Sequence, residues 1–368
     1  MLFGRYGNME GFGSIYRGKT VLVTGHTGFK GSWLAIWLHE LGAKVVGYAL
    51  DPSSERDNFV LSGIGEKIID IRADVRDRDK LNQVFKEFKP EIVFHMAAQP
   101  LVRLSYEQPV ETYETNVMGT INVLETIRSC EETKVGIFVT TDKCYENKEQ
   151  IWGYKESDPL GGHDPYSSSK GAAEIAISSW RRSFFHPNNY EQHGKAISSV
   201  RAGNVIGGGD WAKDRIIPDC IRALEKNIPI EIRSPKSIRP WEHVLEALSG
   251  YLLLGKKMLE DPVKYCSAWN FGPELSSIVT VWNIAHKVIE NYGEGQLIDV
   301  SINKNVHEAE LLSLDISKAW FHLGWKPTLN IEETIEYTVG WYKQHNNQNV
   351  YEICKGQIQA FINKGEHV

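Results

Sequence analysis

The stretch KTVLVTGHTGFKGSWLAIWLHELGAKVVGYAL, residues 19–50, decides the fold. It begins with a short β-branched run at 19–25 that predicts a buried strand. A glycine-rich turn follows, then a helical segment at 32–41 closed by Gly42, and then a second apolar run at 44–50. A strand, turn, helix and strand within about thirty residues form a βαβ unit, which implies a parallel sheet.

The alternation of predicted strands and helices continues to about residue 203. Further strands are expected at 67–73, 91–96, 135–140 and 196–201, and helices at 79–88, 111–130 and 167–185. Elements of these lengths in this order predict an α/β fold, a Rossmann-type doubly wound, mostly parallel sheet with helices on both faces. Beyond Gly203 the alternation breaks, so we expect a smaller, interleaved C-terminal lobe.

The glycine-rich turn lies between the first strand and the first helix, and its spacing is G-x-x-G-x-x-G. Glycine there permits a tight turn and close approach of the backbone to a pyrophosphate, while the helix N-terminus offers N–H donors to phosphates. The place of the turn in a complete βαβ unit favours a dinucleotide site over a turn without a ligand. The residues expected to hold the dinucleotide here are Gly25, Thr27, Gly28, Phe29, Lys30 and Gly31.

Residues after the later strands are expected to contact the same dinucleotide. Asp51 lies just past the second strand, where a carboxylate can bind the adenosine ribose and would repel a 2′-phosphate, so it favours NAD over NADP. A solvated loop aspartate is the alternative. Asp74 and Val75, after the third strand, could contact the adenine. The residues that follow the fourth strand and would lie along the cofactor are Ala97, Ala98 and Gln99.

We divide the chain into four parts on this pattern. Residues 1–17 form an N-terminal extension, 18–203 the NAD-binding Rossmann domain, 204–345 mainly a substrate-binding lobe, and 346–368 a C-terminal tail. The segment near 265–272 either rejoins the sheet or belongs to the smaller lobe.

Tyr166 and Lys170 are four residues apart at the start of a predicted helix, hence on one face of it. A nearby cation stabilises a phenolate and lowers a pKa that starts near 10, so the tyrosine could act as a base near neutral pH. A tyrosine followed four residues later by a lysine is common by chance. The alternative is that the two residues are an exposed pair on the surface of a helix, without a catalytic role. Its place after the fifth strand, downstream of the dinucleotide loop, favours catalysis.

Composition limits the class of protein. The 368 residues are 42% hydrophobic and 24% charged, which excludes a disordered or fibrous chain. The net charge of −6 has the wrong sign for general nucleic-acid binding. Five scattered cysteines without CxxC pairs suggest reduced thiols and no metal site. With neither a secretory signal nor a long apolar run, we expect a cytoplasmic enzyme with a small-molecule substrate and no nucleic-acid or membrane partner.

Several motifs together resemble one family. They comprise the glycines at 25, 28 and 31, Asn116, Thr141, Tyr166 and Lys170. This set is similar to that of the extended short-chain dehydrogenases/reductases, and within these to the sugar-nucleotide branch of epimerases and dehydratases. The resemblance runs from about Gly18 to Tyr342 and includes LDISKAWFHLGWKP at 314–327. It implies that NAD is bound, with Asn116, Tyr166 and Lys170 beside it.

Other stretches resemble more narrowly the 4,6-dehydratases of this branch that act on CDP-D-glucose. They are residues 25–33, 97–103, 140–145, 201–211 and 239–243. The distinguishing element is Thr141-Asp142-Lys143, because related dTDP-glucose dehydratases carry Thr-Asp-Glu there and 4-epimerases carry small or hydroxyl residues. A solvated charge pair is the alternative for Asp142 and Lys143, although strand ends in this fold face the ligand crevice.

The resemblance implies a dehydration that passes through oxidation at carbon 4 of the sugar, since the hydrogen at carbon 5 is otherwise not acidic. Tyr166, ionised beside Lys170, would take the proton of the carbon 4 hydroxyl while hydride passes to NAD, and Thr141 would bond the same oxygen. Asp142 would protonate the hydroxyl that leaves carbon 6, and Lys143 would assist removal of the carbon 5 proton. Hydride would return to carbon 6, with no net redox change.

Polar and basic residues outside these motifs are candidates for substrate binding. They are Arg103, Ser105, Asn204, Arg215, Arg239 and His307. Arg215 and Arg239 could bind the diphosphate by bidentate geometry, or could be surface charges. Preference for cytosine over thymine or uracil follows from the resemblance and not from these residues.

Two other functions stay open. One is an NAD-dependent 4-epimerase or a dehydratase for another nucleotide; an epimerase needs Tyr166 and Lys170 but not the Asp142–Lys143 pair. The other is a catalytically silent dinucleotide sensor, which needs no base.

We expect a homo-oligomer, by analogy with relatives in the sugar-nucleotide branch. Relatives form homodimers or higher homo-oligomers by pairing two long helices, here the predicted helices at 111–130 and 167–185. The apolar residues considered for this contact are Ile121, Leu124, Ile175 and Ile177, which could equally face the sheet.

Overall fold

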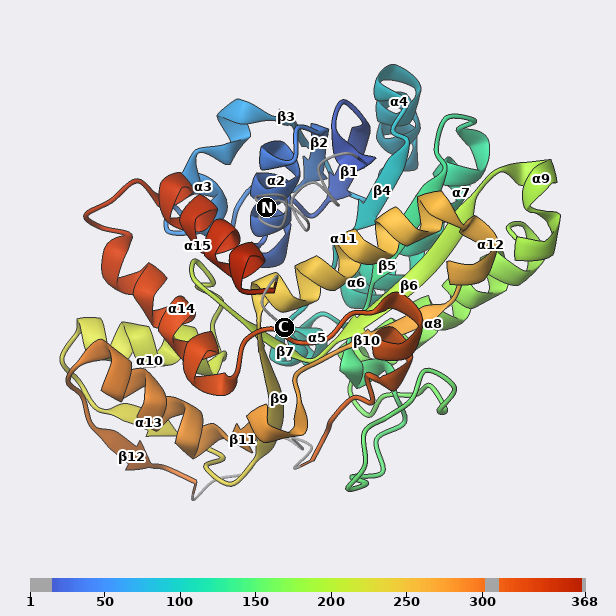
Figure 1. The fold of residues 1–368 in the computed structure, drawn as a ribbon. Helices are drawn as coiled ribbons and strands as arrows, with labels where there is room; N and C mark the ends of the chain where they lie inside the picture. The colour runs from blue at the N-terminus through green and yellow to red at the C-terminus, as the bar shows by residue number, and fades with distance from the viewer. Residues whose placement is uncertain (1–14, 302–310, 366–368) are drawn as a thin grey trace, which may run out of the picture.

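The computed structural model describes residues 15–301 and 311–365, and a seven-stranded sheet forms its centre (Figure 1). Its strands are β1 (Thr20–Thr24), β2 (Lys44–Ala49), β3 (Ile69–Arg72), β4 (Ile92–His95), β5 (Val135–Val139), β6 (Ala196–Ala202) and β10 (Ala268–Phe271). They lie in the order β10-β6-β5-β4-β1-β2-β3 and all pair in parallel. The predicted doubly wound fold is confirmed, and the segment near 265–272 rejoins the sheet as an edge strand.

Helices cover both faces of the central sheet. The helices and short turns of the first two hundred residues are α2 (Phe29–Glu40), α3 (Asn58–Ser62), η1 (Ile64–Lys67), α4 (Arg78–Phe88), α5 (Val102–Glu107), α6 (Pro109–Tyr113), η2 (Glu114–Met118), α7 (Gly119–Ser129), η3 (Asp142–Cys144), α8 (Pro165–Ser183), η4 (Pro187–Asn189) and α9 (Tyr190–His193). Successive residues of β1 point to opposite faces: Val21 and Val23 belong to one buried cluster and Leu22 to the other. This double burial explains why the strands read as continuous apolar runs.

The smaller lobe lies below the carboxyl ends of these strands (Figure 1). Its strands are β7 (Asn204–Ile206), β8 (Ile230–Ile232), β9 (Ile238–His243), β11 (Ile278–Thr280) and β12 (Leu297–Asp299), in two small sheets. The remaining helices and turns are α10 (Ile216–Glu225), α11 (Val244–Glu260), α12 (Pro262–Tyr265), η5 (Leu275–Ser277), α13 (Val281–Tyr292), η6 (Ala319–Leu323), α14 (Ile331–Gln344) and α15 (Val350–Gly365). Because α11 packs on β5 and β6, the two parts interleave along the chain.

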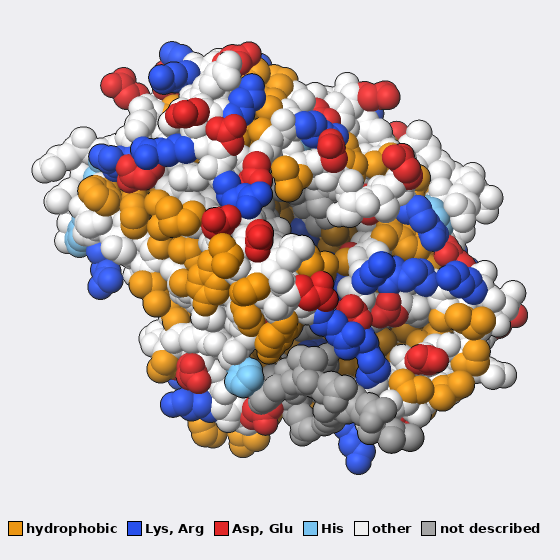
Figure 2. Space-filling view, turned by 180° about the vertical axis from the view of Figure 1, so that it is seen from behind, with side chains coloured by type: hydrophobic (Ala, Val, Ile, Leu, Met, Phe, Trp, Pro, Cys, Tyr) orange, Lys and Arg blue, Asp and Glu red, His pale blue; other side chains and the backbone are white. Residues whose placement is uncertain are grey.

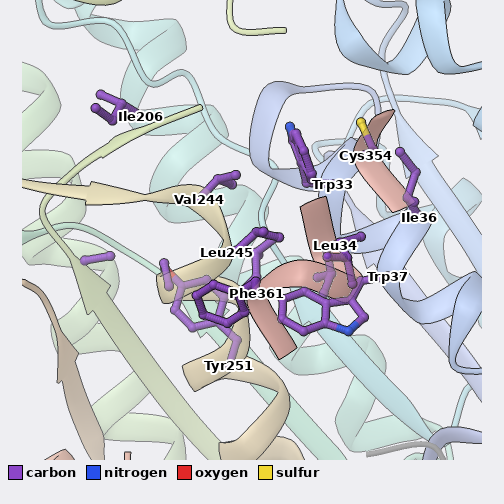
Figure 3. Close-up of a cluster of buried hydrophobic side chains, with 14 of the residues drawn as sticks. Trp33, Leu34, Ile36, Trp37, Ile206, Val244, Leu245, Tyr251, Cys354 and Phe361 are labelled. Atoms are coloured by element: carbon purple, nitrogen blue, oxygen red, sulfur yellow. The ribbon is translucent and has the colours of Figure 1, made fainter. Parts of the chain in front are cut away.

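Residues 346–368, set apart above as a tail, contain a helix that belongs to the core. Helix α15 packs on α2 and α3, and Figure 3 shows Phe361 beside Trp37 and Cys354 near Trp33 and Ile36. The rings of Trp37 and Phe361 meet edge to face with centroids 6.0 Å apart. Buried apolar residues recur along α15 at helical spacing, and this periodicity could have revealed the packed helix.

The surface carries charges of both signs. Over much of the face in Figure 2, acidic and basic side chains lie next to one another. Among the helices described, none is long and apolar enough to cross a membrane.

Candidate active site

A cleft of about 1090 Å³ opens between the carboxyl ends of the central strands and the smaller lobe. The side chains that line it include Phe29, Lys30, Arg103, Thr141, Asp142, Lys143, Tyr166, Asn204, Arg215 and Arg239. Residues predicted from separate motifs therefore share one cavity. Ligands bind in such a crevice in doubly wound sheets.

Asp142 lies in the turn η3, directly after β5. Thr141 is extended and begins this turn; its Oγ1 donates to Asp142 Oδ1 at 2.9 Å and accepts from the backbone N–H of Lys143 at 3.4 Å. Asp142 is fully buried, and its Oδ2 has no hydrogen-bond partner among the residues described. Burial raises the pKa of Asp142, although Lys143 and Arg239 oppose the shift. This carboxyl group is therefore suited to hold a proton.

Tyr166 and Lys170 lie on the first two turns of α8. Pro165 starts the helix, and Asp164 caps it by accepting from the backbone N–H of Ser167 at 2.9 Å. Burial raises the pKa of Tyr166 to about 12. Burial lowers the pKa of Lys170 to about 8, and its Nζ donates to the Val139 carbonyl at 3.2 Å.

The groups that lower the pKa of Tyr166 are Thr141, through a hydrogen bond, and Arg215, through its charge. The expected effect of Lys170 on the pKa of Tyr166 stays a prediction. Burial of the phenol outweighs the cations near it, so the protein's own groups keep Tyr166 neutral at pH 7.

The glycine loop and the start of α2 fit an anion. Gly28 caps the helix with extended backbone, no described side chain caps it, and its first turn holds no acidic residue, so N–H donors stay available. Gly25 has φ +73°, and a Cβ there would lie 2.7 Å from the backbone nitrogen of Ala97. A Cβ at Gly31 would lie 2.1 Å from the carbonyl oxygen of Gly25. These two positions require glycine.

Replacing Gly31 with alanine is expected to lower the free energy of unfolding by about 1–3 kcal/mol, because the backbone of the loop must move. Gly28→Ala is the control, since its Cβ would meet the Gly25 carbonyl oxygen at an ordinary 3.4 Å. Urea unfolding followed by circular dichroism measures both. Equal stability of the two variants would contradict the close packing at Gly31.

The residues predicted to contact the adenosine half of NAD differ in how accessible their side chains are to a ligand. The Asp51 side chain is 87% exposed, with Arg72 at 3.8 Å, and stays open to a ribose. The Asp74 carboxylate binds Arg76 at 2.6 Å. Val75 is buried and packs against Gly119, so its side chain belongs to the core rather than to an open adenine site.

Asn116 and Gln99 form a framework behind the loop. Asn116 lies in η2, a π-helical turn that interrupts the predicted helix at 111–130. Its Oδ1 accepts from the backbone N–H of Gln99 at 2.8 Å, and its Nδ2 donates to Ser169 Oγ at 2.8 Å. The Gln99 amide donates to Thr112, and Thr27 Oγ1 donates to the Leu50 carbonyl. Asn116 thus joins the loop after β4 to α8, whereas Thr27 joins the glycine loop to the end of β2.

Ala97 and Ala98, expected beside the cofactor, follow β4 at its carboxyl end. The Ala97 backbone N–H donates to Thr24 Oγ1 at 3.1 Å. Both side chains are partly exposed, so they leave room beside the glycine loop.

Of the residues predicted to bind substrate, four line the cleft, one is buried behind it and one lies outside the described residues. The four in the cleft are Arg103, Asn204, Arg215 and Arg239. Arg215 pairs with Asp210 at 2.7 Å, and Arg239 donates to the Ile238 carbonyl at 2.8 Å, both within the cleft. Ser105 does not face the sugar as expected: it is fully buried, and its hydroxyl donates to the Val102 carbonyl and accepts from the Tyr166 backbone N–H at 3.1 Å. Ser105 thus positions α8. His307 lies outside the described residues.

The sequence reasoning missed a buried ion pair behind the turn η3. Glu174 of α8 binds Arg201 of β6 at 2.7 Å, with side chains 2% and 3% exposed. Glu174 also accepts from Thr140 and Ser199, and Arg201 donates to the Tyr145 hydroxyl at 2.7 Å. The pair joins α8 to β6, and the bond from Thr140 joins α8 to the end of β5, next to Thr141. The sequence carries no local signal for it.

Asp214 and Arg233, which also line the cleft, were missed as well. The part of the chain that the structure describes holds no group of three His, Cys, Asp or Glu side chains placed to bind a metal ion. All five cysteines are unpaired.

Comparisons with known proteins agree with this geometry. The sequence model of the family described as GDP-mannose 4,6 dehydratase matches residues 22–338. The CDP-glucose 4,6-dehydratase of Salmonella typhimurium is 52% identical over 330 residues, which cover 90% of this chain and 92% of that protein.

Two solved structures share the fold. An epimerase of Methanothermobacter thermautotrophicus superposes with a TM-score of 0.78 at 22% identity, over 95% of this chain and 97% of that chain. A dTDP-glucose 4,6-dehydratase of Bacillus anthracis in complex with NAD has a TM-score of 0.72 at 19% identity, over 89% and 97%.

Proposed function

Because the chain belongs to the GDP-mannose 4,6 dehydratase family, we propose that it removes water from a nucleotide sugar, CDP-D-glucose, with NAD as cofactor. The product is CDP-4-dehydro-6-deoxy-D-glucose. The observation that carries the proposal is the placement of Tyr166, Thr141, Asp142 and Lys143 around one cleft. The high identity to a CDP-glucose 4,6-dehydratase supports the choice of substrate.

The loop at 25–31 and the N-terminus of α2 would hold the pyrophosphate of NAD, and Asp51 would bind the ribose. When bound, NAD supplies reversible hydride exchange with the sugar and a positively charged ring. The framework of Gln99 and Asn116 keeps the loop after β4 close to α8, which keeps Tyr166 next to this site.

Tyr166 removes the proton of the carbon 4 hydroxyl, and Thr141 hydrogen-bonds the same oxygen. Thr141 and Arg215 both lower the pKa of Tyr166, which burial raises. They therefore favour the ionised phenol that the step needs. Lys170, one helical turn further along α8, adds a buried amino group on the same face.

Asp142 and Lys143 carry out the elimination of water. Burial raises the pKa of Asp142, so its carboxyl group can keep a proton and deliver it to the hydroxyl that leaves carbon 6. Lys143 lines the cleft and takes the proton from carbon 5. A 4-epimerase needs neither step, so the pair favours dehydration.

Incubation with CDP-glucose and NAD, followed by NMR of the sugar, tests the function. A 4,6-dehydratase yields the 6-deoxy-4-keto sugar, an epimerase yields the galactose isomer, and a dinucleotide sensor yields no product. Parallel incubations with UDP-glucose and dTDP-glucose test the nucleotide. Absence of the keto sugar with every nucleotide would overturn the proposal.

Replacing Lys143 with methionine is expected to lower the rate of elimination about 10²–10⁴-fold, the usual contribution of a positioned base. Oxidation at carbon 4 should persist, because Tyr166 and Thr141 stay intact. Exchange of the carbon 5 hydrogen with deuterium from solvent measures the step. Lys213→Met is the control, since Lys213 lines the same cleft. Exchange at the full rate in Lys143→Met would exclude this role.

We also propose that the protein acts in the cytoplasm as a homodimer or higher homo-oligomer that pairs the segment of α6, η2 and α7, together with α8, with those of a second copy. Of the apolar residues considered for this contact, Leu124 and Ile177 are buried against the sheet, whereas Ile175 is 59% exposed. Val110 and Met118 are similarly exposed, and Figure 2 shows apolar side chains gathered over the region of α6 and α8.

A further inference from the structure

The cleft contains a carboxylate that the proposed reaction does not use. Asp214 precedes α10 and binds two arginines: Arg103 of α5 with Nη1 3.1 Å from Oδ1, and Arg233, next after β8, with Nη1 2.8 Å from the same oxygen. All three residues line the cleft. Each arginine makes its shortest contact with Oδ1 of Asp214, and among the residues described no hydrogen bond to Oδ2 is found. The group therefore offers an acceptor oxygen next to arginine donors from both sides of the cleft.

This group lies mainly on the smaller-lobe side of the cleft. Asp214 closely precedes α10 and Arg233 directly follows β8, both of the smaller lobe, whereas Asp142 follows β5 and Tyr166 lies on α8. Arg103 of α5 contacts Asp214 from the other side.

A nucleotide sugar is a linear molecule of hexose, two phosphates, ribose and base. The proposed function puts the hexose at Tyr166 and the phosphates at Arg215 and Arg239, which leaves the part of the cleft lined by Asp214 and Arg233 for the base.

The chemistry of this group matches one base. The pairing edge of cytosine has an amino donor at N4 and acceptors at N3 and O2, so it can face a carboxylate and a guanidinium side by side. Uracil and thymine carry a carbonyl oxygen at position 4 and an N–H at position 3. Next to Asp214 and Arg233, O4 of uracil or thymine would face a carboxylate oxygen, so two acceptors would meet. The N3–H group would face an arginine, so two donors would meet. Unpaired polar groups of this kind are costly in a binding site.

We propose that Asp214, held between Arg103 and Arg233, selects cytosine in the substrate. Its Oδ2 accepts a hydrogen bond from the N4 amino group, and Arg233 donates to N3 and O2. The proposal rests on the proposed function, because it takes the hexose to lie at Tyr166.

The backbone at Asp214 limits the residue type. Its φ of +62° is left-handed, a conformation that Asp and Asn adopt more readily than other residues with a side chain. Asparagine therefore keeps the backbone and the shape of the side chain, but can place an amide donor where the carboxylate accepts. Asp214→Asn consequently changes the hydrogen-bonding pattern with little effect on the fold.

The test compares kcat/KM for CDP-glucose and UDP-glucose in the wild type, Asp214→Asn and Asp219→Asn. The ratio of the two values is expected to fall at least about tenfold in Asp214→Asn, the size of a lost base-specific contact. It should stay unchanged in Asp219→Asn, whose carboxylate pairs with Arg222 along the same wall. Calorimetric binding of CDP and UDP, without the sugar, should show the same change.

Two results would overturn the inference: an unchanged ratio in Asp214→Asn, or an equal loss for both nucleotides, which would assign Asp214 to the phosphates or to stability. Failure of the proposed function has a different signature, since the wild type would then form no keto sugar from CDP-glucose. The binding of CDP and UDP would still test Asp214 in that case, because it requires no turnover.

Discussion

Replacing Tyr166 with phenylalanine is expected to lower kcat for the keto sugar about 10³-fold, within the range for loss of a positioned base. In the proposed reaction the phenol takes the proton from the carbon 4 hydroxyl, and no ketone can form while that proton stays. Burial raises the pKa of Tyr166 to about 12, so the step depends on groups that stabilise the phenolate. Single-turnover formation of product, followed by NMR, measures the loss.

Tyr113→Phe is the matched control for this variant. Its hydroxyl donates to Ser168 of α8 at 2.6 Å, so the change removes a phenol that touches the same helix but lies outside the cleft lining. Turnover by Tyr113→Phe should stay close to that of the wild type. If Tyr166→Phe kept more than about a tenth of the wild-type kcat, another group would be the base.

Replacing Glu174 with glutamine is expected to lower the free energy of unfolding by about 3–5 kcal/mol, the usual cost of removing one partner of a buried ion pair. Arg201 would keep its charge in a fully buried site, with the neutral amide in place of the carboxylate. Thr140 and Ser199 would also lose a charged acceptor. Urea unfolding of the purified variant measures the change.

Glu260→Gln is the control, because Glu260 pairs with Lys257 on the surface of α11 and such exposed pairs contribute at most about 1 kcal/mol. The double variant Glu174→Gln with Arg201→Met should be more stable than Glu174→Gln alone, since no buried charge remains. A loss below about 1 kcal/mol in Glu174→Gln would show that the pair does not stabilise the protein.

The predictable part of the site consists of residues close together in sequence. The βαβ unit, the glycine loop and the Tyr166–Lys170 spacing all lie within single local segments, where periodicity and turn chemistry act directly. Thr141, Asp142 and Lys143 were predicted from the resemblance to sugar-nucleotide dehydratases, and their place after a strand supported the prediction, because strand ends in this fold meet at one edge. The structure places these segments around one cleft.

The parts that were missed depend on contacts between distant segments. Asp214 meets Arg103 and Arg233 across the cleft, and no local pattern predicts their meeting. Ser105 was expected at the sugar, but its position on α5 turns the hydroxyl toward the start of α8. The packing of helices and strands that are distant in sequence decides both the contacts of Asp214 and the direction of the Ser105 hydroxyl.

The amino-acid sequence by itself determined the parallel sheet and the dinucleotide loop, because each is encoded in neighbouring residues, and the resemblance to a known family indicated the candidate reacting groups. Only the tertiary structure decided how those groups ionise and what holds them. Burial raises the pKa of Tyr166, whereas the hydrogen bond of Thr141 and the charge of Arg215 lower it. Desolvation and long-range charge pairing depend on which segments the fold brings together, and residue spacing along the chain does not contain that information.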